Sequence, residues 1–317
     1  MKKKFKIAVI SIVAILLLTD VFAGNFFYNL AIKREQKDFL QGNEDLTVSA
    51  AAMDVFLKGG WRQWVQQQDF DQMELESFDG LTLKGYYLAA KEPTNKTVML
   101  AHGYLGNAKD MGLYGQYYYE QLGYNIFMPD ARGHGQSEGD YIGFGWHDRL
   151  DWIDWTEKLI GHTGTDAQII WHGLSMGAAT VLMASGEEHP ENVELIVSDS
   201  AYTSVFELFQ YQMKRMYHLP AFPILPTSSL ITKLRADYSL VEASALEQVK
   251  NAQVPIIYFH GNNDSFVPAE MAETLYQHTT GDKEIMLFDN AGHGEAYAIQ
   301  EEKYQEQLKN SLQKYIE

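Results

Sequence analysis

The pattern of hydrophobic and polar positions divides the chain into three parts. Residues 1–32 are mostly apolar after a basic start, and residues 33–70 are charged and amphipathic, which is typical of helices. Residues 71–317 then alternate short apolar runs with stretches of helical period. The pattern therefore predicts an N-terminal apolar segment, a helical lead-in that is interrupted at Gly59-Gly60, and one globular domain.

The globular part begins with two alternating runs that pivot on Asp79-Gly80, which is a strong signal for a β-hairpin. Six further apolar runs follow, separated by glycine-rich turns and helical stretches. Strands that alternate with helices imply right-handed crossovers and a parallel sheet that is covered on both faces. We therefore expect an α/β fold with a mostly parallel twisted sheet of about eight strands and an antiparallel edge hairpin. The six runs are "KTVMLAHG", "YNIFMPD", "AQIIWH", "VELIVSDS", "VPIIYFHG" and "EIMLFDN".

Residues 201–250 do not follow this alternation. They contain two helical pieces on either side of a break with Pro220, Pro223 and Pro226, and they are rich in Phe, Tyr and Met. An excursion of this kind between two core strands predicts a small helical cap over a pocket. The alternative is a helical crossover that has no role in substrate binding.

The N-terminal segment has the features of an export signal. "MKKKFK" precedes twelve residues of which only Ser11 is polar, and the apolar character continues to Ile32 despite Asp20 and Asn25. The first run is short for a membrane span, which needs about 20 residues. We predict an uncleaved signal-anchor, single-pass in the cell membrane, with the lysines inside and the globular domain outside the cytoplasm. Cleavage near Ala23, which would release a secreted protein, is the alternative.

Composition narrows the range of partners. The chain has 46% hydrophobic residues, which suffices for a substantial core, and a net charge of −17, which argues against a nucleic-acid partner. The absence of cysteine removes disulfides, thiolate zinc sites and a cysteine nucleophile. The sequence has no nucleotide-binding glycine motif and no H-E-x-x-H pattern, so we expect neither a cofactor nor a metal. The oligomeric state stays open.

The motif G-x-S-x-G occurs twice, around Ser137 and around Ser175. A catalytic serine in this motif needs a strand that runs into the turn and a helix that leaves it. Ser175 has both, with "AQIIWH" before it and "MGAATVLMASGEE" after it, and the small residues Gly177, Ala178 and Ala179 let that helix lie close to the sheet. Ser137 lies in a loop with five glycines between positions 133 and 145. The context therefore predicts Ser175 as the nucleophile.

A serine nucleophile needs a base and an orienting acid. Among ten histidines, His293 stands in a glycine-flanked loop just after the last predicted strand, where it can lean over the carboxyl edge of the sheet toward Ser175. Asp264 follows the penultimate strand, and Asp199 follows the strand after the serine. Both carboxylates are candidates for the acid, and the chain order nucleophile, acid, base favours Asp264.

The oxyanion that forms during acyl transfer needs hydrogen-bond donors. The backbone amide of Met176, which follows the serine, is one candidate. The second is the amide of Tyr104, because His102-Gly103 turn the chain just after an early strand. A tight glycine turn with no catalytic part is the alternative interpretation of this loop.

Five stretches of the chain together resemble a known family. They are "AHGYLGN", "PDARGHGQSEG", "HGLSMGAAT", "HGNNDSFVP" and "NAGHGEAY", in this order over about 200 residues. They resemble the serine-nucleophile α/β-hydrolases, and the whole chain is similar to membrane-anchored extracytoplasmic hydrolases of Gram-positive bacteria. The resemblance implies the α/β-hydrolase fold with a small helical cap. It also implies Ser175 as nucleophile, His293 as base, Asp264 as acid and the amides of Tyr104 and Met176 as the oxyanion hole.

Two features depart from the best-known lipases of this family. The oxyanion loop reads His-Gly-Tyr instead of His-Gly-Gly-Gly, which argues against esters of tertiary alcohols. The cap is short, which argues against an interfacially activated lipase. The segment around Ser137 resembles a structural loop of the family.

The leading hypothesis is an extracytoplasmic serine hydrolase of the carboxylesterase kind, which cleaves small or aromatic acyl esters through an acyl-enzyme. A peptidase or an acyltransferase would use the same triad. A non-catalytic surface protein that binds a ligand with this fold is a further hypothesis, against which the intact serine, aspartate and histidine argue. The identity of the acyl and alcohol parts of the substrate stays open.

Overall fold

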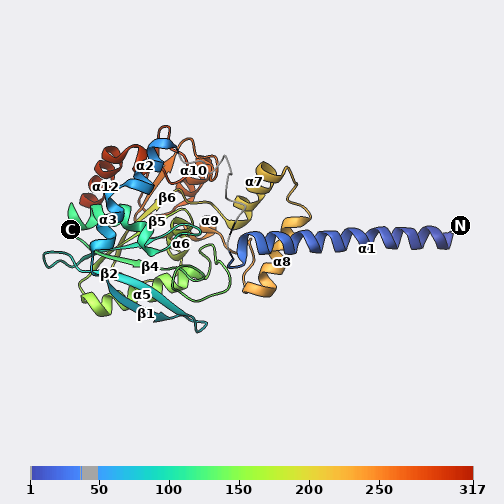
Figure 1. Ribbon diagram of the computed structural model, residues 1–317, viewed down its shortest axis with the longest axis horizontal. Coiled ribbons are helices and arrows are strands. Elements are labelled where there is room, and N and C mark those ends of the chain that lie inside the picture. Colours follow the sequence, from blue (N-terminus) through green and yellow to red (C-terminus); the bar gives the residue numbers. More distant parts are fainter. Residues whose placement is uncertain (1, 36, 38–48, 317) are drawn as a thin grey trace.

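The structure is a computed structural model that describes residues 2–35, 37 and 49–316 (Figure 1). Part of the predicted helical lead-in, residues 36 and 38–48, lies outside the described residues. The remainder forms two short helices, α2 (Ala50–Lys58) and α3 (Gly60–Gln67). Gly59 separates them, at the position where the sequence indicates a break.

Eight strands form one sheet in the order β1-β2-β4-β3-β5-β6-β7-β8. The pairs β1-β2 and β2-β4 are antiparallel, and every other neighbouring pair is parallel. This arrangement confirms the predicted fold class, a mostly parallel sheet with an antiparallel hairpin at its N-terminal edge. The strands are β1 (Asp71–Glu76), β2 (Thr82–Leu88), β3 (Lys96–Ala101), β4 (Asn125–Pro129), β5 (Gln168–Leu174), β6 (Val193–Asp199), β7 (Ile256–Gly261) and β8 (Lys283–Phe288).

Helices cover both faces of the sheet, because side chains along each strand alternate between two buried clusters. On β3 and β4, Met99 and Phe127 join the cluster under α5 and α6, whereas Val98 and Ile126 join the cluster under α3, α4 and α12. The apolar runs that form β3 to β7 are therefore strands buried on both sides, whereas β8, at the edge of the sheet, is mostly half-buried. The helices of the globular part are α4 (Gly112–Glu120), α5 (Asp148–Thr163), α6 (Met176–Ala184), α10 (Ala269–His278), α11 (Ala296–Ile299) and α12 (Glu301–Tyr315), with a 3₁₀ turn at Ala108–Met111.

The segment 201–250 leaves the sheet after β6 and returns to it at β7. It forms α7 (Val205–Tyr217), α8 (Ile224–Ala236) and the single turn α9 (Ala245–Gln248). In Figure 1, α7 and α8 stand between the sheet and the protruding part of the N-terminal helix. The two helical pieces that the sequence predicts are thus present, with Pro220 and Pro223 between them, whereas Pro226 lies in the first turn of α8.

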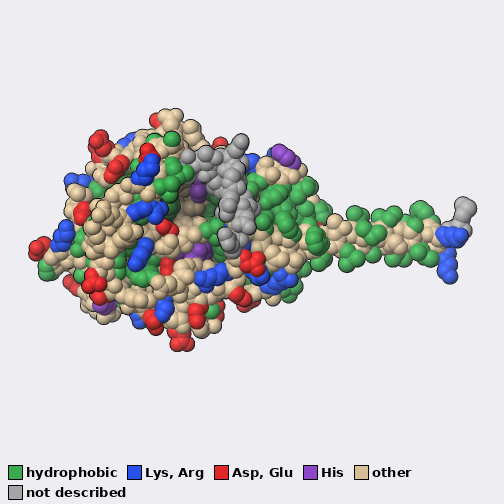
Figure 2. Space-filling model, in the orientation of Figure 1, with side chains coloured by type: hydrophobic (Ala, Val, Ile, Leu, Met, Phe, Trp, Pro, Cys, Tyr) green, Lys and Arg blue, Asp and Glu red, His purple; other side chains and the backbone are tan. Residues whose placement is uncertain are grey.

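The N-terminal segment forms one long helix, α1 (Lys2–Phe27), which continues as a π-helical turn over Tyr28–Ile32. Its first part projects away from the body with exposed apolar side chains, whereas its end packs on α8 (Figures 1 and 2). The stretch Lys3–Ile32 is long and apolar enough, by length and composition, to cross a membrane. This observation agrees with a membrane anchor, and the side of the membrane on which the globular part lies stays a prediction.

Candidate active site

Ser175 occupies the sharp turn between β5 and α6. Its backbone lies at φ +55° and ψ −113°, a conformation that residues other than glycine rarely adopt. The amide of Ser175 donates to the carbonyl oxygen of Asp199 over 2.8 Å, which holds the turn against β6. A strained turn of this kind places the serine hydroxyl at the carboxyl edge of the sheet, clear of the strand that carries it.

The two glycines of the motif are required by close packing around this turn. A Cβ atom on Gly173 would lie 2.2 Å from the carbonyl oxygen of Gly177, and a Cβ atom on Gly177 would lie 2.1 Å from the carbonyl oxygen of Ala101. Distances below 3.0 Å essentially never occur for real Cβ atoms, so either substitution would push α6 away from the sheet. The small residues after Ser175 therefore have the packing role that the sequence indicates.

Ser175, His293 and Asp264 form an unbroken chain of hydrogen bonds. Oγ of Ser175 lies 2.8 Å from Nε2 of His293, and Nδ1 of His293 lies 2.7 Å from Oδ2 of Asp264. The other carboxylate oxygen of Asp264 accepts from the amides of Phe266 and Val267 at 2.9 and 2.8 Å. Because Nδ1 donates to the carboxylate, Nε2 is left as the acceptor for the serine hydroxyl. The structure thus brings together three residues that follow β5, β7 and β8.

The charges within this chain shift the pKa values of its acid and its base. Burial disfavours the carboxylate of Asp264, but the imidazole of His293 and hydrogen bonds from His260 and His293 outweigh it and hold the pKa of Asp264 well below its usual range. Burial also disfavours the imidazolium of His293, but the Asp264 carboxylate outweighs it and raises the pKa of His293 above the ordinary 6.5. A base with a pKa in this region is suited to take the proton of a serine hydroxyl near neutral pH.

Three other histidines at strand ends and turns are buried and have structural contacts. Burial lowers the pKa of His102, and it lowers the pKa values of His134 and His172 to about 3. Nδ1 of His102 donates to the carbonyl oxygen of Gly103 at 2.8 Å, and Nε2 accepts from the amide of Ala131 at 3.0 Å. His102 therefore fixes the loop that follows β3, and it is neutral at physiological pH.

Asp199, the rival candidate for the acid, is engaged elsewhere. It is fully buried and accepts hydrogen bonds from the hydroxyls of Tyr114 and Tyr304 at 3.1 and 3.0 Å, and from Ser200 at 2.9 Å. Oγ of Ser200 in turn accepts from the amide of Gly294, next to the base, at 3.3 Å. Asp199 thus supports the loop that carries His293. Sequence reasoning missed this network, because no local pattern links the two tyrosines to β6.

Ser137, in the second G-x-S-x-G match, also has structural contacts. Its hydroxyl donates to the carbonyl oxygen of Asp130 at 2.6 Å and accepts from the amide of Lys84 at 2.9 Å, which ties the loop after β4 to β2. In the same loop, the buried guanidinium of Arg132 donates two hydrogen bonds of 2.7 Å to Asp151. The loop is therefore a firmly held connection at one side of the sheet.

The two residues expected to supply the oxyanion hole lie next to Ser175. Met176 begins α6, and the first amides of a helix have no partner within it. The loop with Tyr104 lies directly against the serine, since a Cβ atom on Gly103 would be 3.5 Å from Cβ of Ser175. The action of the two amides as an oxyanion hole stays a prediction.

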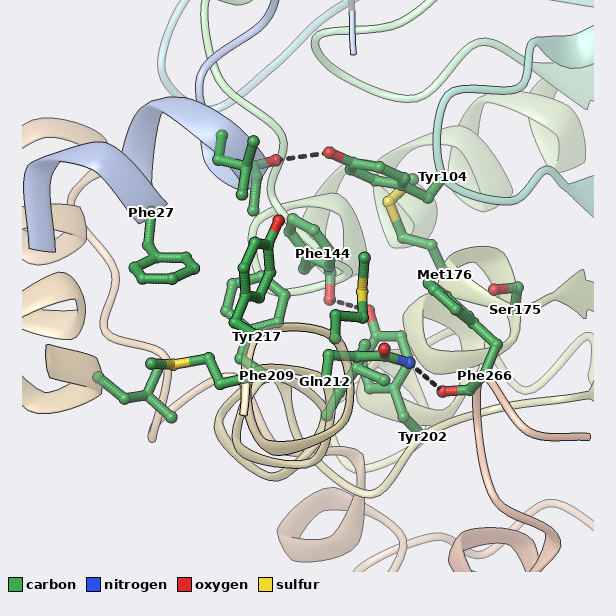
Figure 3. A pocket seen from close by; sticks show the side chains of 16 residues that line it. Phe27, Tyr104, Phe144, Ser175, Met176, Tyr202, Phe209, Gln212, Tyr217 and Phe266 are labelled. Carbon is green, nitrogen blue, oxygen red and sulfur yellow. Dashed lines mark hydrogen bonds between the residues drawn. The ribbon is translucent and has the colours of Figure 1, made fainter. Parts of the chain in front are cut away.

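Two hollows meet at Ser175, and the first is apolar. It has an empty volume of about 760 Å³, including solvent at its mouth, and none of the described residues that line it is charged. Figure 3 shows it between Ser175, Met176 and Tyr104 on one side and Phe27 and Tyr217 on the other. An acyl group that projects from a carbonyl at the serine would find only apolar and neutral polar surface here.

The second hollow lies beside His293 and has charged side chains in its wall. It has an empty volume of about 1110 Å³, and it includes Phe56 and Arg62 of the lead-in helices together with Asp110. Sequence reasoning gave the lead-in helices no part in the site. Across the part of the chain that the structure describes, no group of three or more His, Asp or Glu side chains could hold a metal ion.

Comparison with known sequences places this geometry among hydrolases. The family described as "Serine aminopeptidase, S33" matches residues 92–221, and the "Dienelactone hydrolase family" matches residues 236–316. The chain is 28% identical over 250 residues to the uncharacterized protein YqkD of Bacillus subtilis, which covers 77% of this chain and 81% of that protein. It is 25% identical over 251 residues to lysophosphatidylserine lipase ABHD12 of Macaca fascicularis, which covers 75% of this chain and 54% of that protein.

Solved structures show the same architecture. The esterase Pf2001 of Pyrococcus furiosus is similar with a TM-score of 0.64 at 20% identity, and the match covers 80% of this chain and 96% of that one. At this identity the similarity concerns the fold alone. Two hydrolase families match consecutive parts of the chain, and the sheet order and the serine turn agree with them. The chain therefore belongs to the α/β-hydrolase family of serine hydrolases.

Proposed function

We propose that the protein cleaves carboxylic esters through an acyl-enzyme intermediate. The observation that carries this proposal is the chain of hydrogen bonds from Ser175 through His293 to Asp264, buried at its acid end and open to a hollow at its serine end. A base held by a buried carboxylate and bonded to a serine hydroxyl has the geometry that activates the serine as a nucleophile.

The proposed reaction follows from this geometry. Oγ of Ser175 attacks the ester carbonyl carbon, and its proton passes to Nε2 of His293, while Asp264 stabilises the imidazolium that forms. The amides of Tyr104 and Met176 donate to the oxyanion of the tetrahedral intermediate. The intermediate collapses, the alcohol leaves with the proton of the imidazolium, and the acyl group stays on the serine. Water then attacks the acyl-enzyme with the same base, and the carboxylic acid is released.

We assign the acyl part of the substrate to the apolar hollow. Aromatic side chains such as Phe144 and Phe209 line it, and it carries no charge among the described residues, which favours apolar acyl groups. The alcohol part would then occupy the second hollow, near Arg62. The sequence similarity to a lysophosphatidylserine lipase supports an ester substrate.

A peptidase is the second candidate, because the family that matches residues 92–221 is described as a serine aminopeptidase. An aminopeptidase must bind a positively charged amine, and Asp110 in the second hollow offers a carboxylate. The same wall contains the cationic Arg62, which would oppose such binding. We therefore place the ester hydrolase first.

A substrate panel on the full chain tests this ranking. We expect kcat/KM for p-nitrophenyl esters, varied in acyl length and aromatic content, to exceed that for alanine p-nitroanilide by about a hundredfold or more. Faster cleavage of the anilide would overturn the ester assignment in favour of a peptidase. Failure of every substrate, together with no labelling by a fluorophosphonate probe, would leave a non-catalytic binding protein.

The pKa of His293 predicts the pH dependence of the reaction. The imidazole must be neutral to accept the serine proton, and a raised pKa keeps it protonated up to a higher pH. We therefore expect kcat/KM for p-nitrophenyl acetate to rise with pH through a midpoint above 6.5. Asp264→Asn removes the charge that raises this pKa, so the residual activity should have its midpoint at a lower pH. A midpoint that does not move would contradict the assignment of this titration to His293.

We further propose that α1 anchors the protein in the cell membrane as a single pass, with the globular part outside the cytoplasm. Support comes from the apolar stretch Lys3–Ile32 and from the lysines at its start. Mass analysis of the N-terminus of the protein isolated from cells tests the anchor, because cleavage near Ala23 would remove the first part of α1.

A further inference from the structure

The apolar part of α1 is too short to cross a bilayer without its C-terminal end. The run from Ile7 to Leu18, polar only at Ser11, has twelve residues and rises about 18 Å, against a hydrocarbon layer of roughly 30 Å. A span of about 20 residues that starts at Ile7 ends near Phe26. If α1 crosses the membrane, the residues from Thr19 to Phe26 therefore lie in the hydrocarbon or at its edge.

These same residues of α1 pack on α8. The hydroxyl of Thr227 donates to the carboxylate of Asp20 at 2.5 Å, and the hydroxyl of Ser228 donates to the carbonyl oxygen of Gly24 at 3.2 Å. A Cβ atom on Gly24 would lie 2.8 Å from Cγ2 of Thr227, so the two helices touch here. The contact gives Asp20 a polar partner at a depth where a bare carboxylate is unfavourable. It also holds α8 at the level where α1 leaves the hydrocarbon.

The exposed side chains of α8 include two leucines, with the exposed Lys233 and Arg235 on either side of the second one. Leu230 and Leu234 are one helical turn apart and are 60% and 77% exposed, and Phe222, just before the helix, is 78% exposed. Leu234 also borders a groove with Leu18 and Phe22 of α1. Figure 2 shows apolar side chains gathered over α7 and α8, next to the apolar stalk of α1. The exposed apolar surface is thus continuous with the membrane-spanning helix, which points to lipid as its occupant.

The charge of this region also fits a lipid surface. The segment 201–250 has five basic and four acidic residues, whereas the whole chain has 25 and 42. Lys214 and Arg235 are exposed on this segment together with Asp237, and Lys33 and Arg34 are exposed just after α1, where Lys33 pairs with the exposed Glu35. An anionic bilayer repels acidic surfaces and attracts basic ones. An anionic bilayer would therefore repel segment 201–250 and the end of α1 less than it repels the rest of this acidic protein.

The apolar hollow at Ser175 joins these helices to the candidate active site. Its lining includes Phe27 from the end of α1 and Leu225 from α8. The hydroxyl of Tyr104 donates to the carbonyl oxygen of Ala31 at 2.8 Å, so the loop of the proposed oxyanion hole is fastened to the end of the anchor (Figure 3). The anchor thus forms one wall of the hollow.

We propose that α7, α8 and the end of α1 rest in the surface of the bilayer and open this hollow toward the lipid. The substrate is then an acyl ester of a membrane lipid, whose chain enters the hollow from the membrane and whose ester is hydrolysed to a free acid and an alcohol. This inference rests on the proposed ester hydrolase function. The hollow already borders Ser175, and its lining includes Phe27 of α1 and Leu225 of α8. The short cap, which argues against an interfacially activated lipase, is consistent with such an entrance.

Contact between α8 and lipid can be measured with one fluorescent label, because the chain has no cysteine of its own. The full chain with Leu234→Cys, labelled with nitrobenzoxadiazole in vesicles of phosphatidylcholine and phosphatidylglycerol, should be quenched by lipids that carry a doxyl group on an acyl chain. Leu57→Cys on α2, where the native leucine is 58% exposed, is the matched control and should not be quenched. Equal behaviour at both positions would overturn the proposal. A signal at position 234 that depends on protein density but not on doxyl lipid would indicate a second copy of the chain and would overturn it too.

Entry of substrate from the membrane has a separate test. In the same vesicles, the double variant Leu230→Ser, Leu234→Ser should hydrolyse 4-methylumbelliferyl palmitate, a probe that partitions into lipid, about tenfold more slowly than the unchanged chain. Its rate on water-soluble p-nitrophenyl acetate should be unchanged, since neither leucine lines the hollows at Ser175. Leu57→Ser should affect neither rate. If the double variant hydrolyses the palmitate ester as fast as the unchanged chain does, the membrane entrance alone is overturned. If the unchanged chain does not hydrolyse p-nitrophenyl acetate at all, the ester hydrolase proposal itself is overturned.

Discussion

Ser175→Ala is expected to lower kcat for p-nitrophenyl butyrate by about a millionfold. The methyl group of alanine cannot attack the carbonyl carbon. Among the described residues, the hydroxyl that bonds to Nε2 of His293 is that of Ser175, so the variant has no replacement nucleophile there. The rate that remains would come from binding and from the oxyanion donors. The measurement is steady-state turnover of the purified full chain, with fluorophosphonate labelling as a second readout that should disappear in the variant.

The matched control for this experiment is Ser137→Ala, which changes the other G-x-S-x-G match. This serine bonds to two backbone groups, so its loss should lower the free energy of unfolding by roughly 1–3 kcal/mol and leave turnover by the folded protein unchanged. A thermal melt of both variants separates lost activity from lost folding. Substantial activity in Ser175→Ala, or loss of labelling in folded Ser137→Ala, would show that the nucleophile lies elsewhere.

Asp264→Asn is expected to lower kcat by about ten-thousandfold, because an amide at this position no longer favours the tautomer of His293 that accepts from the serine. In the native protein, one carboxylate oxygen of Asp264 accepts from Nδ1–H of His293, and the other accepts from two backbone amides. An asparagine could satisfy these partners only in part, and it would also remove the charge that stabilises the imidazolium. Steady-state turnover of p-nitrophenyl butyrate near neutral pH measures the effect.

Asp199→Asn provides the comparison, because Asp199 is the other carboxylate that the sequence allows as the acid. Oδ2 of Asp199 accepts from the hydroxyls of Tyr114 and Tyr304, and the amide oxygen of asparagine can still accept from both. Only the hydrogen bond that Ser200 donates to Oδ1 would be lost, because the amide NH2 group cannot accept it. We expect kcat to fall by less than about tenfold, with the larger effect on stability. A greater loss in Asp199→Asn than in Asp264→Asn would reverse the assignment of the acid.

The fold was predictable because its signals are local. Apolar runs bounded by glycine-rich turns, with helical periods between them, mark the strands and crossovers of a parallel sheet, and Asp79-Gly80 marks the edge hairpin. Burial of both faces of β3 and β4 requires residues that are apolar without a break, and such runs are visible in the sequence.

The candidate triad was predictable for a related reason. Parallel strands end at one edge of the sheet, so residues that directly follow β5, β7 and β8 converge there although they are about 30 to 118 positions apart. The order of strand ends was therefore enough to select Ser175, His293 and Asp264 as candidates. It was not enough to exclude Asp199, the last residue of the neighbouring strand β6, because the direction of a side chain depends on its packing partners.

By itself, the sequence determined the alternation of strands and helices, the apolar N-terminal segment and the strand ends that carry the candidate chemistry. Only the tertiary structure decided that Phe27 and Ala31, at the end of that segment, stand beside Ser175, and that α8 packs on α1. The physical reason is one of range. Periodicity and turn signals report how a residue meets neighbours a few positions away. Ala31 and Tyr104 are 73 positions apart in the sequence, and Gly24 and Ser228 are 204 positions apart. Only the packing of whole helices brings such residues into contact.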